Sequence, residues 1–273
     1  MGADASVGDT AHDWLTRGET APGAGFQWAK PSEAGAATVS GPAARADALN
    51  VGRGQPLPRT PNAEPNRPRA ATPLGAGEAE TGARRIARSA ETLEGLEAAL
   101  QGFDGCGLKA TATKLCFYRG APQADVMIIG EAPGRDEDLA GKPFVGRAGQ
   151  LLDKMLAAIG LSEADVHITN VVYWRPPGNR TPTPQEALAC RPFLERQIEL
   201  VAPKLLVAVG GSAAKEVLGA SEGIMRLRGK WREIEVGDRK IPAIATLHPA
   251  YLLRTPAAKQ LAWLDLLQIK SKL

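Results

Sequence analysis

The sequence predicts an α/β domain: a three-layer α/β/α sandwich around a central, mainly parallel sheet of four strands. From about residue 90, short apolar runs alternate with amphipathic segments, a pattern typical of right-handed βαβ units. The runs are apolar along most of their length, as expected for strands that are buried on both faces. Each run also ends in a polar or glycine-containing motif, and ligands of parallel sheets bind at the carboxyl ends of strands.

The N-terminal part of the chain has a different composition. Residues 1–85 are rich in Ala, Gly and Pro with scattered charge, and such a segment buries too little apolar surface to offset the entropy of ordering. We therefore interpret residues 1–85 as a disordered tail or linker and residues 86–273 as the folded domain. The stretch "AHDWLTRG" around Trp14 is a weak candidate for a short helix or docking segment.

The elements of the domain follow in order. The stretch "SAETLEGLEAALQGF" has helical periodicity, and Ser89 is the candidate N-cap. Two further helical stretches, "AGQLLDKMLAAIG" and "PQEALACRPFLERQIELV", separate the first three apolar runs. The four predicted strands are residues 125–130, 166–172, 204–211 and 241–248.

The composition indicates the cellular compartment in which the protein is expected. The sequence shows no secretory leader and no apolar run near the ~20 residues that span a bilayer. Three cysteines without framework spacing agree with a reducing compartment. We therefore expect a cytoplasmic monomer, associated with the nucleoid if the source is bacterial.

Charge alone does not identify a partner. The formal net charge of +3 is too small to decide between ligand classes. Locally, "RLRGKWR" places four cations around Trp231. This segment is either a solvated hairpin face or an edge that contacts phosphates.

Polar groups gather where the predicted strands end. The four ends read "GEAPG", "NVVYWRPPGNR", "GGSAAK" and "HPAYLLR". If the strands are parallel, Glu131, Asn170 and His248 meet at one edge of the sheet. A carboxylate, an amide and an imidazole then share one cleft.

Each of these motifs also has a purely structural interpretation. Gly130 and Pro133 suit a tight turn, Asn170 can cap its own turn, and a His before Pro is commonly a hydrogen-bonded loop residue. The acidic run at residues 136–138 suits the first turn of a helix. The coincidence of such groups at four strand ends favours a functional site.

Several long motifs together resemble a known family. The segments "GEAPGRDEDLAGKPFVGRAGQLLDKML", "ITNVVYWRPPGNRTPTPQEALAC", "LRGKW" and "LHPAYLLR", in this order, resemble the uracil-DNA glycosylase superfamily, closest to its iron-sulfur-type (thermostable, family 4-like) branch. The resemblance covers residues 103–273. It implies a DNA repair glycosylase that hydrolyses the N-glycosidic bond of flipped-out uracil in DNA and leaves an abasic site.

The resemblance also assigns roles to residues. Glu131 matches the acidic residue that orients water or stabilises the sugar cation. Phe144 matches the aromatic residue that stacks on the flipped base, and Asn170 the amide that reads the uracil edge. His248 matches the histidine that donates to uracil O2 as negative charge builds there. The other matched positions are Gly130 in the base-binding strand end and the supporting acids Glu137 and Asp138.

Side chains of the same loops are the candidates for DNA contacts. Apolar side chains next to the histidine can fill the gap left by a flipped base, and cations can contact phosphates. The candidate wedge residues are Tyr251, Leu252 and Leu253, and the candidate phosphate contacts are Arg175, Arg180, Arg228, Lys230 and Arg254. The expected partner is DNA that contains uracil or a related damaged base.

The cysteines depart from the family pattern. Cys106 and Cys190 match two of the four cluster positions of the iron-sulfur branch, whereas Lys109 and Trp174 stand at the other two. A [4Fe-4S] cluster ordinarily takes four thiolates, and this chain has three cysteines. We therefore expect no cluster, no other metal and no cofactor, with Trp174 packing the vacated volume.

Other interpretations remain open. A related branch that is trapped covalently on DNA uses a His after the second strand, where this chain reads "PPGNRTPTPQE", so ordinary turnover is expected. No lyase activity is expected, because no Lys lies at a strand end of the cleft to form a Schiff base. An altered pocket rim leaves a broadened range of damaged bases open. The alternative from another class is a non-catalytic DNA-binding or damage-sensing protein of the same fold. A nucleotide-binding protein is a weaker hypothesis because no Lys-Ser/Thr pair follows the glycines.

Overall fold

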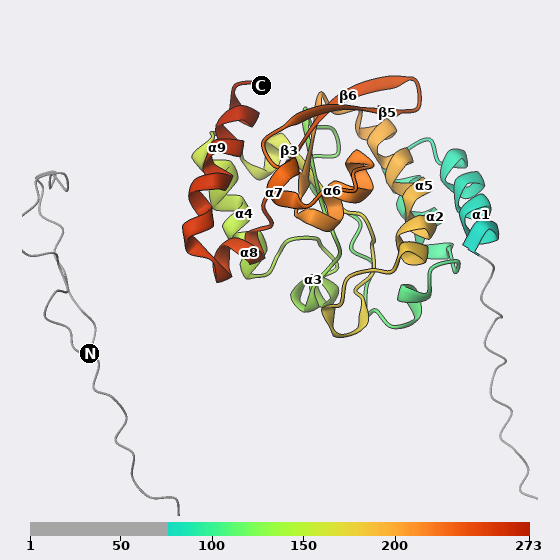
Figure 1. The fold of residues 1–273 in the computed structure, drawn as a ribbon. Coiled ribbons are helices and arrows are strands. Elements are labelled where there is room, and N and C mark those ends of the chain that lie inside the picture. The colour runs from blue at the N-terminus through green and yellow to red at the C-terminus, as the bar shows by residue number, and fades with distance from the viewer. Residues whose placement is uncertain (1–75) are drawn as a thin grey trace, which may run out of the picture. The chain divides into compact units, whose positions relative to one another are not determined.

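The fold is built on one six-stranded sheet with helices on both faces (Figure 1). The structure, a computed structural model, describes residues 76–273. The strand order is β1-β3-β2-β4-β6-β5, in which the inner four strands are parallel and the two edge strands antiparallel. The strands are β1 (Arg119–Gly120), β2 (Val126–Gly130), β3 (Val166–Asn170), β4 (Leu205–Val209), β5 (Trp231–Val236) and β6 (Arg239–Thr246).

The predicted sheet of four strands is therefore too small. All four predicted strands are present, as β2, β3, β4 and β6, and they are parallel. The sheet is nevertheless mixed, because β1 and β5 extend it at both edges. Neither edge strand has a strong sequence signal: β1 is two residues long, and β5 lies in the basic segment "RLRGKWR" and its continuation.

Alternate side chains of the inner strands belong to two separate hydrophobic cores, one on each face of the sheet. On β2, Met127 and Ile129 belong to the core beneath α1, α2, α5 and α6, whereas Val126 and Ile128 belong to the core beneath α4, α8 and α9. This period-2 alternation is the geometry of a strand that is covered on both faces. The helices are α1 (Ala76–Ser89), α2 (Leu93–Gly102), α3 (Arg135–Ala140), α4 (Arg147–Ala158), α5 (Pro184–Val201), α6 (Gly211–Leu218), α7 (Ile224–Leu227), α8 (Pro249–Arg254) and α9 (Lys259–Lys270), and the 3-10 turns are Gly107–Ala110, Glu163–Asp165, Pro177–Asn179 and Pro256–Ala258.

The folded domain begins earlier than the composition predicts. Residues 76–85, which we assigned to the tail, form most of α1, and this helix packs along α5. Its buried face consists of small residues such as Ala83 and Ala87, which is why the segment resembles a low-complexity linker. Ser89 ends α1 and is not an N-cap; the hydroxyl of Thr92 caps α2 by accepting from the amide of Gly95 at 3.1 Å.

The remaining predictions for the N-terminal region lie outside the described residues. These are the disordered state of residues 1–75 and the docking segment around Trp14. Among the helices of residues 76–273, none is both long enough and apolar enough to cross a membrane.

A buried polar network fastens α5 to β3. The side chain of Gln197 donates to Nε2 of His167 at 2.9 Å and accepts from the Tyr173 hydroxyl at 2.9 Å. His167 in turn donates from Nδ1 to the carbonyl of Ala121 at 2.7 Å. His167 must be neutral in this arrangement, because a proton on Nε2 would face the amide hydrogens of Gln197. Burial accordingly lowers the pKa of His167 to about 4.

This network predicts a pH-dependent stability. The folded-state pKa of His167 lies below the ordinary value of 6.5, so between these pH values the unfolded chain binds a proton that the folded chain does not. The free energy of unfolding should then fall as the pH is lowered from about 6.5 towards 4, by up to ~1.4 kcal/mol per pH unit for this side chain.

Urea denaturation of His167→Gln at several pH values checks this prediction. We expect the variant to show a shallower slope over that pH range than the wild type. An unchanged slope in His167→Gln would show that His167 is not the titrating group.

Candidate active site

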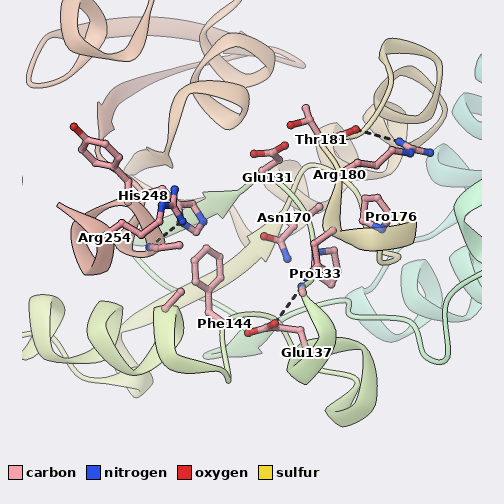
Figure 2. A pocket seen from close by; sticks show the side chains of 16 residues that line it. Glu131, Pro133, Glu137, Phe144, Asn170, Pro176, Arg180, Thr181, His248 and Arg254 are labelled. Carbon is pink, nitrogen blue, oxygen red and sulfur yellow. Dashed lines mark hydrogen bonds between the residues drawn. The ribbon is translucent and has the colours of Figure 1, made fainter. Parts of the chain in front are cut away.

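A cavity of about 470 Å³ lies at the carboxyl ends of β2, β3 and β6. Figure 2 shows its side chains, with Glu131, Asn170 and Phe144 around one space and His248 beside Phe144. The predicted triad of Glu131, Asn170 and His248 is thus brought together in one cavity. The lining residues are Glu131, Ala132, Pro133, Gly134, Glu137, Phe144, Ala148, Asn170, Pro176, Asn179, Arg180, Thr181, His248, Ala250, Tyr251 and Arg254.

Asn170 is the most unusual polar residue of the cavity. It is the last residue of β3, and only 1% of its surface is exposed. Neither Nδ2 nor Oδ1 has a hydrogen-bond partner among the described residues. Burying an amide without hydrogen-bond partners costs free energy. A ligand in the cavity can supply these partners. Asn170 therefore offers a donor and an acceptor to a ligand rather than capping its own turn.

The backbone opposite Asn170 leaves room for this amide. Gly130 pairs with Asn170 at the end of the β2–β3 ladder. A Cβ atom at position 130 would lie 2.4 Å from the Asn170 side-chain oxygen and 2.5 Å from the Phe144 ring. Glycine is therefore favoured here by close approach, and the base-binding role of Gly130 stays a prediction.

Phe144 forms an aromatic wall of the cavity. It is buried, and its backbone adopts a left-handed conformation with φ of 55°. The Phe144 ring stacks against His248, with ring centroids 5.7 Å apart and an interplanar angle of 29°. Gly149 leaves room for this conformation, because a Cβ atom there would lie 1.6 Å from the Phe144 carbonyl oxygen. A strained residue held by its surroundings is a common feature of binding sites.

His248 presents a neutral imidazole to the cavity. It is the N-cap of α8, and its Nδ1 accepts a hydrogen bond from the amide of Ala250 at 3.1 Å. The ring proton must then be on Nε2. Burial, and secondarily the charge of Arg254, lower the pKa of His248 to about 4. At neutral pH the residue is therefore a hydrogen-bond donor without a net charge.

The two predicted supporting acids both accept hydrogen bonds from loop backbone; Glu137 lines the cavity and Asp138 does not. Glu137 accepts from the amide of Gly134 at 3.1 Å and from the amide of Gly146 at 2.8 Å. It thereby joins the loop after β2 to the loop that carries Phe144. Asp138 is buried and accepts from the amides of Thr113 and Lys114 at 2.7 and 3.1 Å. Both carboxylates bind loop backbone, which agrees with a supporting role.

Several predicted DNA contacts lie at or near the rim. Arg180 and Arg254 line the cavity, and Arg180 makes a two-point ion pair with Glu186 at 2.6 and 2.8 Å. Arg175 donates to the side chain of Asn179 at 2.6 Å. Tyr251 is exposed and also lines the cavity. The predicted contacts with exposed side chains elsewhere are Lys230 and Leu253.

Two other predicted DNA contacts are largely buried. Leu252 is 1% exposed and packs in the core beneath α8, so it is not free to fill a gap in DNA. The side chain of Arg228 is 14% exposed, and its guanidinium pairs with Asp265 at 2.6 Å. Its Nε and Nη2 donate to partners inside the protein, so most of the guanidinium is engaged there, and the phosphate contact at Arg228 stays a prediction.

With this geometry in place, the chain can be compared with known proteins. The family model for the uracil DNA glycosylase superfamily matches residues 117–267. The chain belongs to this superfamily. It is 41% identical to the type-4 uracil-DNA glycosylase of Archaeoglobus fulgidus over 174 residues, which cover 62% of this chain and 87% of that protein. The type-4 uracil-DNA glycosylase of Thermotoga maritima is 43% identical over 150 residues, or 55% of this chain and 77% of that protein.

The resemblance to the family 4-like branch is thereby confirmed. The match to a second branch is more limited. The type-5 uracil-DNA glycosylase of Pyrobaculum aerophilum is 35% identical over 114 residues, which cover 36% of this chain and 50% of that protein.

Membership of the type-4 branch corrects the prediction that the protein has no cofactor. Type-4 uracil-DNA glycosylases are iron-sulfur enzymes, so the relatives point to a cluster. The matching cysteines do lie together: the Cys190 thiol donates to Cys106 with the sulfur atoms 3.8 Å apart, and both are buried. This bond holds the pKa of Cys106 below its ordinary value and raises that of Cys190.

The described residues supply only part of such a site. Lys109 bonds to Asp104 and to the carbonyl of Gln101, and Trp174 is buried. Cys116 bonds elsewhere, to the carbonyl of Glu137. Among residues 76–273, no group of three or more His, Cys, Asp or Glu side chains is arranged to hold a metal ion. Two neighbouring thiols do not complete the four-thiolate set that a [4Fe-4S] cluster ordinarily takes.

Sequence reasoning missed some residues of this uracil-DNA glycosylase superfamily site. Thr181 and Ala148 line the cavity. Thr181 follows a segment that drew attention for its prolines and arginines, whereas Ala148 lies in a helix and has no chemical signal of its own. The amide of Gly146 holds the Phe144 loop by donating to Glu137, and Gly149 leaves room for the Phe144 backbone. A sequence without aligned relatives shows neither.

The close packing around Gly130 generates a prediction. The substitution Gly130→Ala should lower uracil excision at least about a hundredfold, because a displacement of about 1 Å within an active site can cost this much. Gly223→Ala is the matched control, since a Cβ atom there meets nothing within 4 Å.

Initial rates on an end-labelled oligonucleotide with one uracil check this prediction, with thermal unfolding confirming that both variants fold. Near-wild-type excision by Gly130→Ala would show that the Asn170 amide does not need the position that it occupies here.

Proposed function

We propose that the protein repairs DNA by hydrolysing the N-glycosidic bond of a flipped-out uracil, leaving an abasic site. The observation that carries this proposal is the Asn170 amide, which is buried at the cavity with both polar atoms unpartnered. Uracil presents an N3–H donor next to an O4 acceptor, which is the complement of one amide. The activity named for the type-4 relatives agrees with this substrate.

The aromatic wall supplies the second part of base recognition. The Phe144 ring borders the cavity next to Asn170, as Figure 2 shows. A base in the cavity that pairs with Asn170 can stack on this ring, and such stacking replaces part of what the base loses on leaving the duplex. The volume of the cavity, about 470 Å³, and its mixture of polar and apolar lining residues support a nucleobase as the ligand.

The chemistry requires stabilisation of two opposite charges. Cleavage of the bond between N1 and C1′ develops negative charge on the base and oxocarbenium-like charge on the sugar. The Nε2–H of His248 is the donor for the oxygen of the departing base. Glu131 lines the same cavity, and its carboxylate is our assignment for stabilising the sugar cation and orienting the attacking water.

A direct excision assay tests this function. Wild-type protein and an oligonucleotide with one uracil, followed by alkali, should give strand cleavage. Asn170→Ala and His248→Ala should each lower the rate about a hundredfold or more, since removal of one such donor commonly costs that much. Lys204→Ala is the control, because Lys204 is exposed just before β4, at the opposite end of that strand from the cavity.

The outcome separates the two classes of function. Cleavage by the wild type with loss in both variants supports the glycosylase. An absence of cleavage with retained DNA binding would favour the alternative, a non-catalytic DNA-binding or damage-sensing protein of the same fold.

The proposal extends to other deaminated bases. Hypoxanthine and xanthine carry an N1–H donor next to an O6 acceptor, the same edge pattern that uracil presents to an amide. A cavity of about 470 Å³ is compatible with a two-ring base. These two features support a range of substrates broader than uracil alone.

A panel of oligonucleotides with one modified base tests this range. We expect excision of uracil to be fastest, hypoxanthine to be excised measurably, and thymine and cytosine to remain intact. Asn170→Ala should remove the activity on uracil and hypoxanthine together. Failure to release hypoxanthine at high enzyme concentration would limit the function to uracil.

The proposal also covers the side chains that contact DNA and the assembly state of the protein. We assign Arg175, Arg180, Lys230 and Arg254 to phosphate contacts. Tyr251 and Leu253 are the remaining candidates to fill the gap left by the flipped base. The protein acts as a monomer in this proposal.

A further inference from the structure

A buried carboxylate lies behind the active site, outside the cavity. Asp265 on α9 has no exposed surface. Its Oδ2 accepts from the hydroxyl of Thr246 at 2.8 Å and from Nε of Arg228 at 3.1 Å, and its Oδ1 accepts from Nη2 of Arg228 at 2.6 Å. Arg228 also donates to the carbonyl of Leu261. We call Thr246, Arg228 and Asp265 the Asp265 cluster.

The Asp265 cluster fastens the chain on the N-terminal side of His248. Thr246 is the last residue of β6, two positions before His248. Its carbonyl accepts from the amide of Gly210 at 2.9 Å. Thr246 is therefore bound to α9 through its hydroxyl and to the chain after β4 through its carbonyl. The segment that carries Arg228 is bound to β6 as well, through the amide of Gly229 and the carbonyl of Ala245 at 2.9 Å.

The chain on the C-terminal side of His248 packs mainly on α4 and on the 3-10 turn Pro256–Ala258, which leads into α9. His248 caps α8, and Leu252 of α8 is buried in the core that contains Leu266 and Ala262 of α9. The segment before the imidazole is therefore held on α9 by directional polar contacts, and the segment after it is held by apolar packing of α8 on α4. A change in the position of α9 relative to β6 would move His248.

An ion pair at this place is not explained by stability alone. Burying a carboxylate and a guanidinium costs solvation free energy, and apolar residues of similar volume often stabilise a core as well or better. What an apolar contact lacks is direction. The two-point pairing of Arg228 with Asp265, together with the Thr246 hydroxyl, fixes the position of α9 along β6.

We propose that Asp265 is a positioning residue for base excision, which acts through Thr246 and Arg228 to hold Nε2 of His248 where charge develops on the departing base. The inference rests on the proposed function. It gives Arg228 an internal role in addition to the phosphate contact that its basic segment suggested.

Paired substitutions at Thr246 test the inference. Thr246→Val keeps the shape of the side chain but removes the hydroxyl, whereas Thr246→Ser keeps the hydroxyl. Thr246→Val should lower kcat for uracil excision about tenfold and leave KM for the oligonucleotide within about twofold, because a displaced catalytic group affects the chemical step. Thr246→Ser should retain most of the wild-type kcat.

A second background separates positioning from general destabilisation. If the Asp265 cluster acts through His248, Thr246→Val should have no further effect on kcat in a His248→Ala protein. Arg228→Lys provides a second variant, because lysine keeps the charge but cannot pair at two points. It should reproduce the loss of kcat and the dependence on His248.

The outcomes are distinct. An unchanged kcat in both Thr246→Val and Arg228→Lys, or an equal loss with and without His248, would overturn the positioning role. An absence of uracil excision by the wild-type protein would instead overturn the proposed function. Thermal unfolding of each variant confirms that the compared proteins are folded.

Discussion

The register between β2 and β3 is the constraint on which the site depends. In this parallel ladder Gly130 lies opposite Asn170 at the last pair, and the cavity begins where the ladder ends. Side chains alternate between faces along a strand, so a slip by one residue would turn Asn170 away from the cavity. The register is fixed well before that point, because Ile128 and Ile168 form a buried pair within one of the two cores. Ordinary apolar packing thus sets the position of an amide that itself contributes nothing favourable to folding.

The cavity concentrates several costs that the rest of the fold must offset. A buried polar group without a partner costs about 1–3 kcal/mol, and Asn170 leaves both amide atoms unpartnered. Phe144 has a left-handed backbone, and His248 is held neutral by burial. Contacts elsewhere must offset these costs. One of them is the Glu137 carboxylate, which joins two loops beside the cavity by accepting from their backbone amides. In the proposed function, a base that pairs with the amide recovers part of this free energy on binding, which favours ligands with a matching edge.

The sequence predicts the inner strands and the meeting of Glu131, Asn170 and His248, because these follow from apolar runs and from the geometry of parallel sheets. It predicts less about features that depend on which face of an element a residue occupies. Leu252 and Arg228 have the residue types of a wedge and a phosphate contact, yet both point inward. The alanines of α1 resemble a linker until α5 is placed against them. Asp265 does leave a signal, as a lone carboxylate in the apolar stretch "LAWLDLLQI", but its partners lie 19 and 37 residues away and come together only in the fold.

The protonation state of His248 links the chemistry to these inward-pointing residues. A charged imidazolium would attract a departing base strongly, and its position would matter less because Coulomb attraction falls slowly with distance. A neutral Nε2–H donor acts only at hydrogen-bond distance and along one direction. Its contribution to the transition state therefore depends on how well it is placed before the reaction begins. Such a donor requires rigid support on both sides, which apolar packing under α8 supplies on one side and the Asp265 cluster on the other. The low pKa of the imidazole keeps the donor neutral, and the buried ion pair behind it holds that donor in position. In the proposed mechanism, accurate placement of the donor takes the role that a positive charge would otherwise have.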